Sequence, residues 1–210
     1  LMATYALMQF IFAPVWGRLS DQHGRKPILM LGILGNAMAS LLFGLSTQLW
    51  MLFAARALAG ILSSATLPTA MAYIGDSTSE EDRGGGMGIM GAAMGVGMVI
   101  GPGVGGWLAV KSLSLPFFLA AALSMVALLL VWWLLPESLT LEEQAKATAT
   151  AVDGSFKTQF RDMWQALSGP IAFLLVLAFL LSFGMTNFES VFGLYSLERF
   201  NYGPQQVGGI

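Results

Sequence analysis

Charged side chains that interrupt apolar runs are the places where this chain could do chemistry. The sequence has 210 residues, of which 56% are hydrophobic and 10% charged. Glu189 is the acid that lies well inside an apolar run, and Arg56 is a base inside another. A carboxyl group in a poorly hydrated site has a raised affinity for protons. Glu189 could therefore take up and release a proton, and the same charge could meet a cationic ligand.

Each of these two residues has a plainer interpretation. Glu189 could be a structural, hydrogen-bonded acid, or it could be exposed if its helix ends earlier. Arg56 could extend its side chain to the outer interface of a membrane. A charge held at the centre of a span costs about 2.5–3.5 kcal/mol and less near the ends. The functional interpretation is that Arg56 faces a central cavity and modulates a proton-carrying acid.

The densest charge cluster is the stretch GRLSDQHGRKP, residues Gly17–Pro27. Gly24 permits a tight turn with positive φ. Arg25 and Lys26 would hold the stretch on the cytoplasmic side. Asp21 is not needed for that retention, so we expect it to pair with a cation or with the N-terminal end of another helix. The alternative is a topology anchor whose charges are solvated.

Several classes of function are not indicated. The chain has no cysteine and one histidine, His23, so no metal site is predicted. It shows no nucleophile–base pair and no phosphate-binding loop, which argues against an enzyme. The formal net charge of −2 gives no basic surface for nucleic acid.

Apolar runs of near-spanning length predict an all-α, polytopic membrane helix bundle. A spanning helix needs about 20 mostly apolar residues. The first run starts as if inside a helix, so we interpret the chain as an internal fragment of a longer protein. The runs cover Leu1–Trp16, Ile28–Ser46, Trp50–Ile74, Met87–Val110, Pro116–Leu135 and Pro170–Leu197.

The Lys and Arg residues predict the orientation and the domain boundaries. Alternate breaks lie on opposite sides; the first, third and fifth hold seven Lys or Arg residues, and the other three hold two. The Gly17–Pro27 stretch and the long break Pro136–Ser168 therefore face the cytoplasm. We expect a helix-bundle half over 1–135, a cytoplasmic linker over 136–168 and the start of a second half over 169–210. The spacing in Phe156–Leu167 favours an interfacial amphipathic helix, with a simple linker as the alternative.

These motifs resemble the major facilitator superfamily along essentially the whole chain. GRLSDQHGRKP resembles its loop between the second and third helices, although Gln22 stands where the family more often has a basic residue. GIMGAAMGVGMVIGPGVGG resembles the fifth-helix signature of drug–proton antiporters, and FESVFGLYSLERFNYGPQQVG resembles the seventh helix of bacterial multidrug and tetracycline effluxers. The matching positions are Gly17, Asp21, Gly24, Arg25 and Lys26 in the loop, Arg56, Asp76 and Arg83 in and after the fourth helix, and Gly88, Gly97, Gly101, Pro102, Gly105 and Gly106 in the fifth.

The resemblance implies a multi-pass plasma (inner) membrane carrier of twelve helices in two halves, here from the second helix to the start of the eighth. It implies a charge latch of Asp21, Arg25 and Asp76, with Arg83 close by, and proton coupling through Glu189 and Arg56. Close packing at Gly101–Gly106, with a kink at Pro102, would seal the membrane against protons. Residues that could line the substrate cavity are Gln9, Asn36, Thr66, Asn187, Phe188 and Phe192.

The expected function is proton-coupled export of small lipophilic or cationic drugs, with no cofactor beyond the proton gradient. The expected partners are substrate, protons and the lipid bilayer, and the protein is expected to be a monomer. An alternative is a transporter of sugars, metabolites or siderophores. A membrane receptor or scaffold that does not transport is the alternative from another class.

Overall fold

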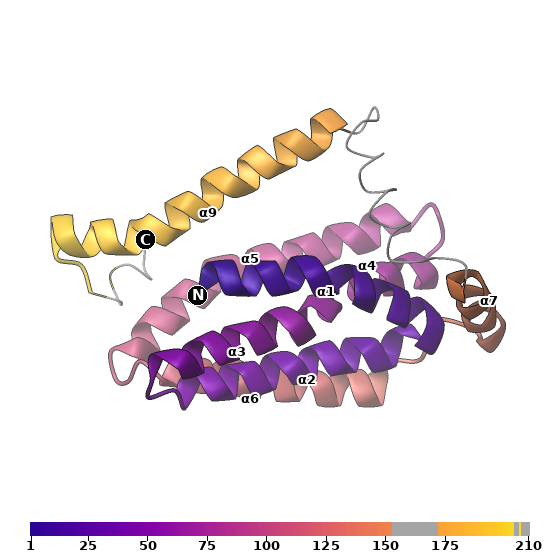
Figure 1. Ribbon diagram of the computed structural model, residues 1–210, viewed down its shortest axis with the longest axis horizontal. Helices are drawn as coiled ribbons and strands as arrows, with labels where there is room; N and C mark the ends of the chain where they lie inside the picture. Colours follow the sequence, from indigo (N-terminus) through magenta and orange to yellow (C-terminus); the bar gives the residue numbers. More distant parts are fainter. Residues whose placement is uncertain (153–171, 204–205, 207–210) are drawn as a thin grey trace.

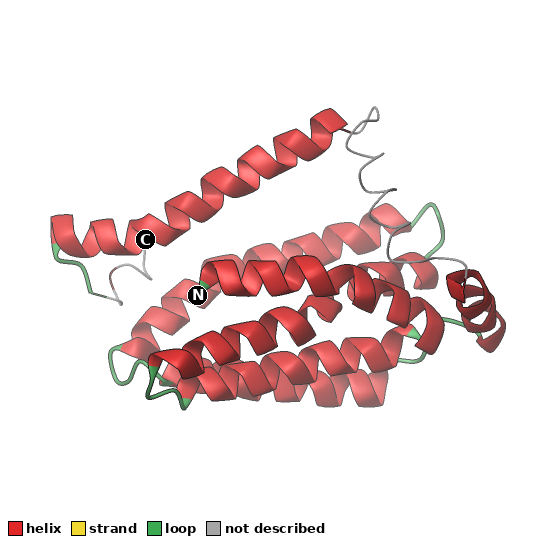
Figure 2. Ribbon diagram, in the orientation of Figure 1, coloured by secondary structure: helices red, strands yellow, loops and turns green. Residues whose placement is uncertain are grey.

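The computed structural model describes residues 1–152, 172–203 and 206, and the regular elements among them are helices (Figures 1 and 2). Because the apolar runs are long and carry few breakers, each forms a helix of membrane-spanning length or part of one. The elements are α1 (Met2–His23), α2 (Arg25–Gly44), α3 (Leu49–Leu62), the short 3₁₀ helix η1 (Ser63–Ala65), α4 (Thr66–Ser77), α5 (Arg83–Ala109), α6 (Leu115–Leu134), α7 (Leu141–Val152) and α9 (Ala172–Phe200).

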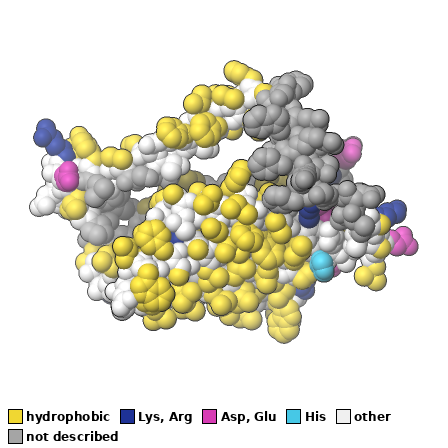
Figure 3. All heavy atoms as spheres, viewed as in Figure 1, with side chains coloured by type: hydrophobic (Ala, Val, Ile, Leu, Met, Phe, Trp, Pro, Cys, Tyr) yellow, Lys and Arg dark blue, Asp and Glu magenta, His cyan; other side chains and the backbone are white. Residues whose placement is uncertain are grey.

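Five helical segments of the described chain are long and apolar enough to cross a membrane. They are Arg25–Gly44, Leu49–Ser77, Arg83–Ala109, Leu115–Leu134 and Ala172–Phe200. In the second, α3, η1 and α4 follow one another without a break. Figure 3 shows hydrophobic side chains over the body of the bundle and charged side chains gathered mainly at its ends. The expected polytopic helix bundle is confirmed.

The charged stretch after the first run differs from the expected loop. Helix α1 continues through Arg18 and Asp21 to His23, and Gly24 alone separates it from α2. Gly24 has a φ of 97°, the positive value expected for it, and it is the only glycine with positive φ in the described chain. The turn therefore needs a single residue, because glycine adopts this conformation without steric cost.

The start of the predicted linker forms helix α7. Thr140 and Glu143 hydrogen-bond reciprocally at the start of α7, the pattern known as a capping box. The backbone and hydroxyl hydrogen bonds from Thr140 lower the pKa of Glu143. The amphipathic helix expected over Phe156–Leu167 lies outside the described residues.

Small residues allow the packed helices to approach closely. A Cβ at Gly60 of α3 would lie 2.6 Å from the carbonyl oxygen of Tyr5 in α1, and one at Gly32 of α2 would lie 2.5 Å from Thr66 Oγ1. The main packed pairs are α2 with α6, α2 with α3, and α1 with α3. Helix α9 runs along one side of this bundle, apart from it in the view of Figure 1.

Candidate functional site

Arg25 is the centre of an ion cluster where α1, α2 and α4 meet. Its Nη1 lies 2.5 Å from Asp21 Oδ1, and its Nε lies 2.8 Å from Asp76 Oδ2. The Arg25 side chain is only 11% exposed. The last turn of α1, the first residue of α2 and the last turns of α4 position these groups. The structure thus brings together the three residues predicted to form the latch.

Ser20, which is not among the residues predicted from the sequence, also belongs to this cluster. It is fully buried, accepts a hydrogen bond from Arg25 Nη1 at 2.8 Å and donates one to the carbonyl of Gly17 at 2.7 Å. The signal for it in the sequence was slight, since serine beside Asp21 is unremarkable in a polar stretch. Its burial is what fixes the direction of the guanidinium.

The other residues of the predicted latch lie around the cluster. Lys26 Nζ donates to the carbonyl of Trp132 at the end of α6, at 2.9 Å. Arg83 Nη2 donates to the carbonyl of Gly75 near the end of α4, at 3.1 Å. Both cations thus bind carbonyl oxygens near the C-terminal ends of helices, where the negative end of the helix dipole favours a positive charge. A Cβ at Gly17 would meet nothing within 4 Å among the described residues.

Arg56 rests on an aromatic surface. Its guanidinium carbon lies 4.8 Å from the ring centre of Phe43, and that ring lies 4.4 Å from Phe117. Arg56 Nε is buried without a hydrogen-bond partner in the described part of the chain. A cation–π contact of this kind contributes about 0.5–2 kcal/mol. The aromatic rings therefore compensate part of the cost of holding this charge within α3.

Glu189, the predicted proton carrier, lies within α9, but its side chain is outside the described part. Because α9 continues to Phe200, the interpretation in which the helix ends before Glu189 is excluded. The neighbouring Asn187 donates to the carbonyl of Phe183 in its own helix at 2.8 Å. Phe188 and Phe192 lie against each other with ring centres 5.0 Å apart.

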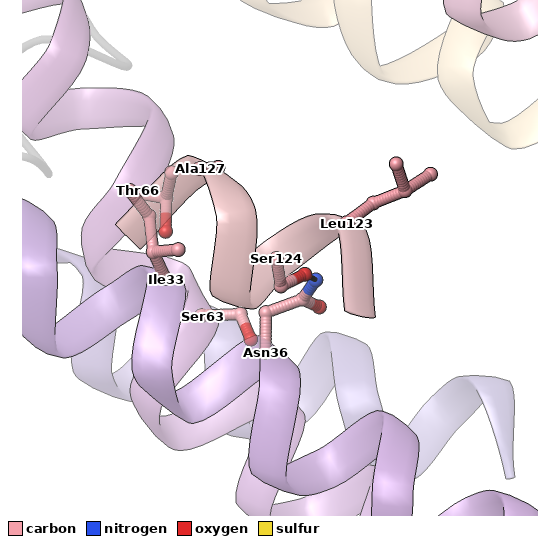
Figure 4. Close-up of a pocket in the computed structure, with 7 residues that line it drawn as sticks. All are labelled: Ile33, Asn36, Ser63, Thr66, Leu123, Ser124 and Ala127. Atoms are coloured by element: carbon pink, nitrogen blue, oxygen red, sulfur yellow. Dashed lines mark hydrogen bonds between the residues drawn. The ribbon is translucent and has the colours of Figure 1, made fainter. Parts of the chain in front are cut away.

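A pocket of about 410 Å³, lined by both apolar and polar side chains, lies between α2, η1, α4 and α6 (Figure 4). Asn36 Nδ2 donates to Ser124 Oγ at 2.9 Å, and these two side chains point toward each other with Ser63 close by. The hydroxyls of Ser63 and Thr66 are buried without a partner among the described residues. The residues that line this pocket are Ile33, Asn36, Ser63, Thr66, Leu123, Ser124 and Ala127.

The pocket contains only some of the residues predicted to line the substrate cavity. Of those six residues, Asn36 and Thr66 line it. Gln9 belongs to α1, and Asn187, Phe188 and Phe192 belong to α9. Ser63 and Ser124 join the set, and Ser124 gave no signal in the sequence, because one serine within the apolar run of α6 does not reveal which helix it faces.

The predicted antiporter motif lies on α5 and faces open space in the described structure. A Cβ at Gly88, Gly97, Gly101 or Gly105 would meet nothing within 4 Å, whereas Gly106 is buried. Pro102 lies inside the helix. A packing or sealing role for these residues stays a prediction. No cluster of three or more metal-ligating side chains occurs among the described residues.

Comparison with known proteins places this geometry in context. The family model described as Major Facilitator Superfamily matches residues 1–210. The chain is 32% identical to "Multidrug resistance protein 2" of Bacillus subtilis, with 100% of this chain and 52% of that protein covered. It is 35% identical to "Tetracycline resistance protein, class B" of Escherichia coli, with 99% and 50% covered.

A solved structure shows a similar arrangement of helices. It is that of the human organic anion transporter MFSD10 (TETRAN), with a TM-score of 0.68 at 25% identity. The alignment covers 97% of this chain and 50% of that one. The chain therefore spans about half the length of the relatives it matches.

Proposed function

This chain belongs to the Major Facilitator Superfamily, and we propose that the protein exports small lipophilic or cationic drugs from the cytoplasm in exchange for protons. The family and its fold are those of multi-pass transporters of the cell membrane rather than of enzymes. The similarity to proteins named for multidrug and tetracycline resistance supports drugs as the substrate class. We further propose that it works as a monomer and needs no cofactor other than the proton gradient.

The observation that carries the proposal is the ion cluster of Arg25 with Asp21 and Asp76. A carrier must close one end of its path, and it must open that end again in each cycle. The cluster joins the ends of three helices through only two ion pairs, and Asp21 is 48% exposed to water. Contacts of this kind contribute modestly to stability, so they can break within a transport cycle.

We propose that Glu189 carries the proton and that Arg56 modulates its release. A carboxyl group that releases a proton when a cationic drug arrives couples the two fluxes, because both compete for one charge. The pocket around Asn36 and Thr66 has no charged lining residue, and its mixed apolar and polar lining fits a role in binding an uncharged part of a substrate.

The test uses the full-length protein in inverted membrane vesicles. A lipophilic cation, a sugar and an organic anion are offered in turn, and substrate-dependent proton movement is recorded. We expect movement with the lipophilic cation. A response only to the sugar or only to the anion would replace the proposed substrate class, and no response to any of them would favour a receptor or scaffold.

The variant Glu189→Gln tests the coupling. It removes the titratable group but keeps the size of the side chain, so transport driven by a pH gradient should fall to background while membrane insertion persists. Glu198→Gln in the same helix is the matched control and should transport normally. Efflux by Glu189→Gln at the wild-type rate would assign the proton to another residue.

A further inference from the structure

We infer that Glu137, at the junction of α6 and α7, is a positioning residue that holds the N-terminus of α2 and thereby sets Arg25 for its two ion pairs. The inference rests on the proposed function only for its effect on transport. Glu137 comes 112 residues after Arg25 in the chain, so no local pattern links them.

The N-terminus of α2 lacks a capping side chain of its own. The residue before the helix is Gly24, which has no side chain to accept hydrogen bonds. The first backbone N–H groups of a helix have no partner within it. Pro27 has no N–H group. The backbone N–H groups of Arg25 and Lys26 therefore need an acceptor from elsewhere in the protein.

The Glu137 carboxylate accepts both of these hydrogen bonds. Its Oε1 lies 2.7 Å from Arg25 N, and its Oε2 lies 3.1 Å from Lys26 N. A negative charge at this point also meets the positive end of the helix dipole. The carboxylate is oriented in turn by the backbone N–H groups of Ser138 and Leu139, at 3.0 and 3.3 Å.

Gly24 makes room for this carboxylate. A Cβ at Gly24 would lie 2.5 Å from Glu137 Oε2 and 2.8 Å from its carboxyl carbon. Glycine is therefore favoured here for a second reason, in addition to its positive φ. Any other residue would push the carboxylate away from the two N–H groups that it binds.

Two further contacts fasten the same junction to the bundle. Lys26 Nζ binds the carbonyl of Trp132, and Tyr73 of α4 donates to the carbonyl of Pro136 at 3.1 Å. The end of α6 is thus tied to α2 and to α4. Arg25 is the point at which these ties meet the ion cluster, since Glu137 holds its backbone while Asp21 and Asp76 hold its side chain.

The consequence is that the cluster responds to the position of the α6–α7 junction. If the junction moves away from α2, the backbone N–H of Arg25 loses its acceptor. The backbone of Arg25 is then no longer held in place, and the position of its guanidinium is no longer fixed. Loss of one capping side chain changes a helix equilibrium on the order of 5-fold. We expect a change of that size in the opening of the first turn of α2.

Hydrogen exchange in the full-length protein tests the contact without any substrate. The amides of Arg25 and Lys26 are followed in the wild type, in Glu137→Gln and Glu137→Ala, and in the control Glu142→Gln. The control removes the same charge from the same segment. Exchange should be about 5-fold faster in Glu137→Ala, intermediate in Glu137→Gln and unchanged in the control. Equal exchange in Glu137→Ala and the wild type would overturn the inference.

A double-mutant cycle with Asp76→Asn tests whether Glu137 acts through Arg25. The readout is the turnover of proton-coupled drug export, with KM measured separately. If both residues hold Arg25, the turnover of the double variant Glu137→Gln/Asp76→Asn should be no slower than that of the slower single variant. The KM for the drug should stay at the wild-type value. Additive losses, or a loss confined to KM, would overturn the positioning role. An inactive wild type would instead refute the proposed function, and the exchange result would still decide the contact.

Discussion

Arg25 binds two carboxylates that differ in what they connect. Asp21 lies four residues earlier, on the adjoining turn, and its side chain is 48% exposed, while Asp76 belongs to α4 and is 29% exposed. An exposed ion pair contributes about 0–1 kcal/mol, and a less exposed pair contributes more. The pair with Asp76 also joins two helices that are distant in sequence, so it should govern the latch more than the pair with Asp21.

We therefore predict that Asp76→Asn slows turnover more than Asp21→Asn does, by about 5-fold against about 2-fold, with KM nearly unchanged in both. The substitution removes the charge and retains a hydrogen-bond acceptor. Initial rates of drug-driven proton movement in vesicles provide the measurement. Wild-type turnover in both variants would mean that the cluster only fixes the orientation of the chain in the membrane and does not act as a latch.

Arg56 depends on the ring of Phe43, which leads to a second prediction at this scale. Phe43→Leu keeps an apolar side chain but removes the cation–π contact, so we expect a loss of about 0.5–2 kcal/mol in stability and weaker proton coupling. Phe117→Leu is the control, because Phe117 contacts Phe43 and makes no cation–π contact with Arg56. Thermal unfolding in detergent and the pH dependence of export would be compared. Identical losses in the two variants would mean that aromatic packing alone matters.

At the scale of helices, the glycines serve two distinct purposes. Gly32, Gly35 and Gly60 lie where two helices approach closely, and a side chain there would collide with the neighbouring helix. Most of the densely spaced glycines of α5 face open space in the described structure, with Gly86 and the buried Gly106 as exceptions. Glycine spacing alone marks close approach between membrane helices in general, but it does not say which glycines of a chain are used.

This difference predicts opposite outcomes for two glycine substitutions. Gly60→Ala places a methyl group 2.6 Å from the carbonyl oxygen of Tyr5, so it should destabilise the bundle by about 1–3 kcal/mol. Gly85→Ala in α5 meets nothing within 4 Å of the described chain and should leave stability unchanged or slightly improved. Thermal unfolding of the two variants makes the comparison. A tolerated Gly60→Ala would show that α1 and α3 are not in close contact.

At the scale of the whole molecule, the charge distribution divides the bundle into two sides. The ion cluster, the contact of Arg83 with Gly75 and the junction at Glu137 lie at the ends of α1, α4 and α6 and at the starts of α2 and α5. The turns at 45–48 and 110–114 lie at the opposite ends of the same helices. The excess of Lys and Arg therefore belongs to one face, which the positive-inside rule predicts to be the cytoplasmic one.

The orientation can be checked by labelling intact cells. These 210 residues contain no cysteine, so labelling within them reports the introduced cysteine alone. Thr47→Cys and Leu113→Cys should react with a membrane-impermeant maleimide added outside, whereas Glu81→Cys should react only after the membrane is opened. All three positions are exposed. Labelling of Glu81→Cys from outside would invert the proposed topology.

The pairing of Arg25 with Asp21 and Asp76 was implied by the family resemblance and not by residue patterns. The patterns themselves predicted the class of fold, the approximate bounds of five spans and the turn at Gly24. These follow from local rules, since spanning length, glycine freedom and charge placement all act within short segments. Tertiary structure alone decided that Ser20 and Glu137 complete the Arg25 cluster, that Phe43 holds Arg56 and that Gly32 and Gly60 make the close contacts. Ser20 lies only five residues before Arg25, and its burial is what the structure added. The other contacts join different segments of the fold, and a contact between two segments leaves no spacing pattern within either one.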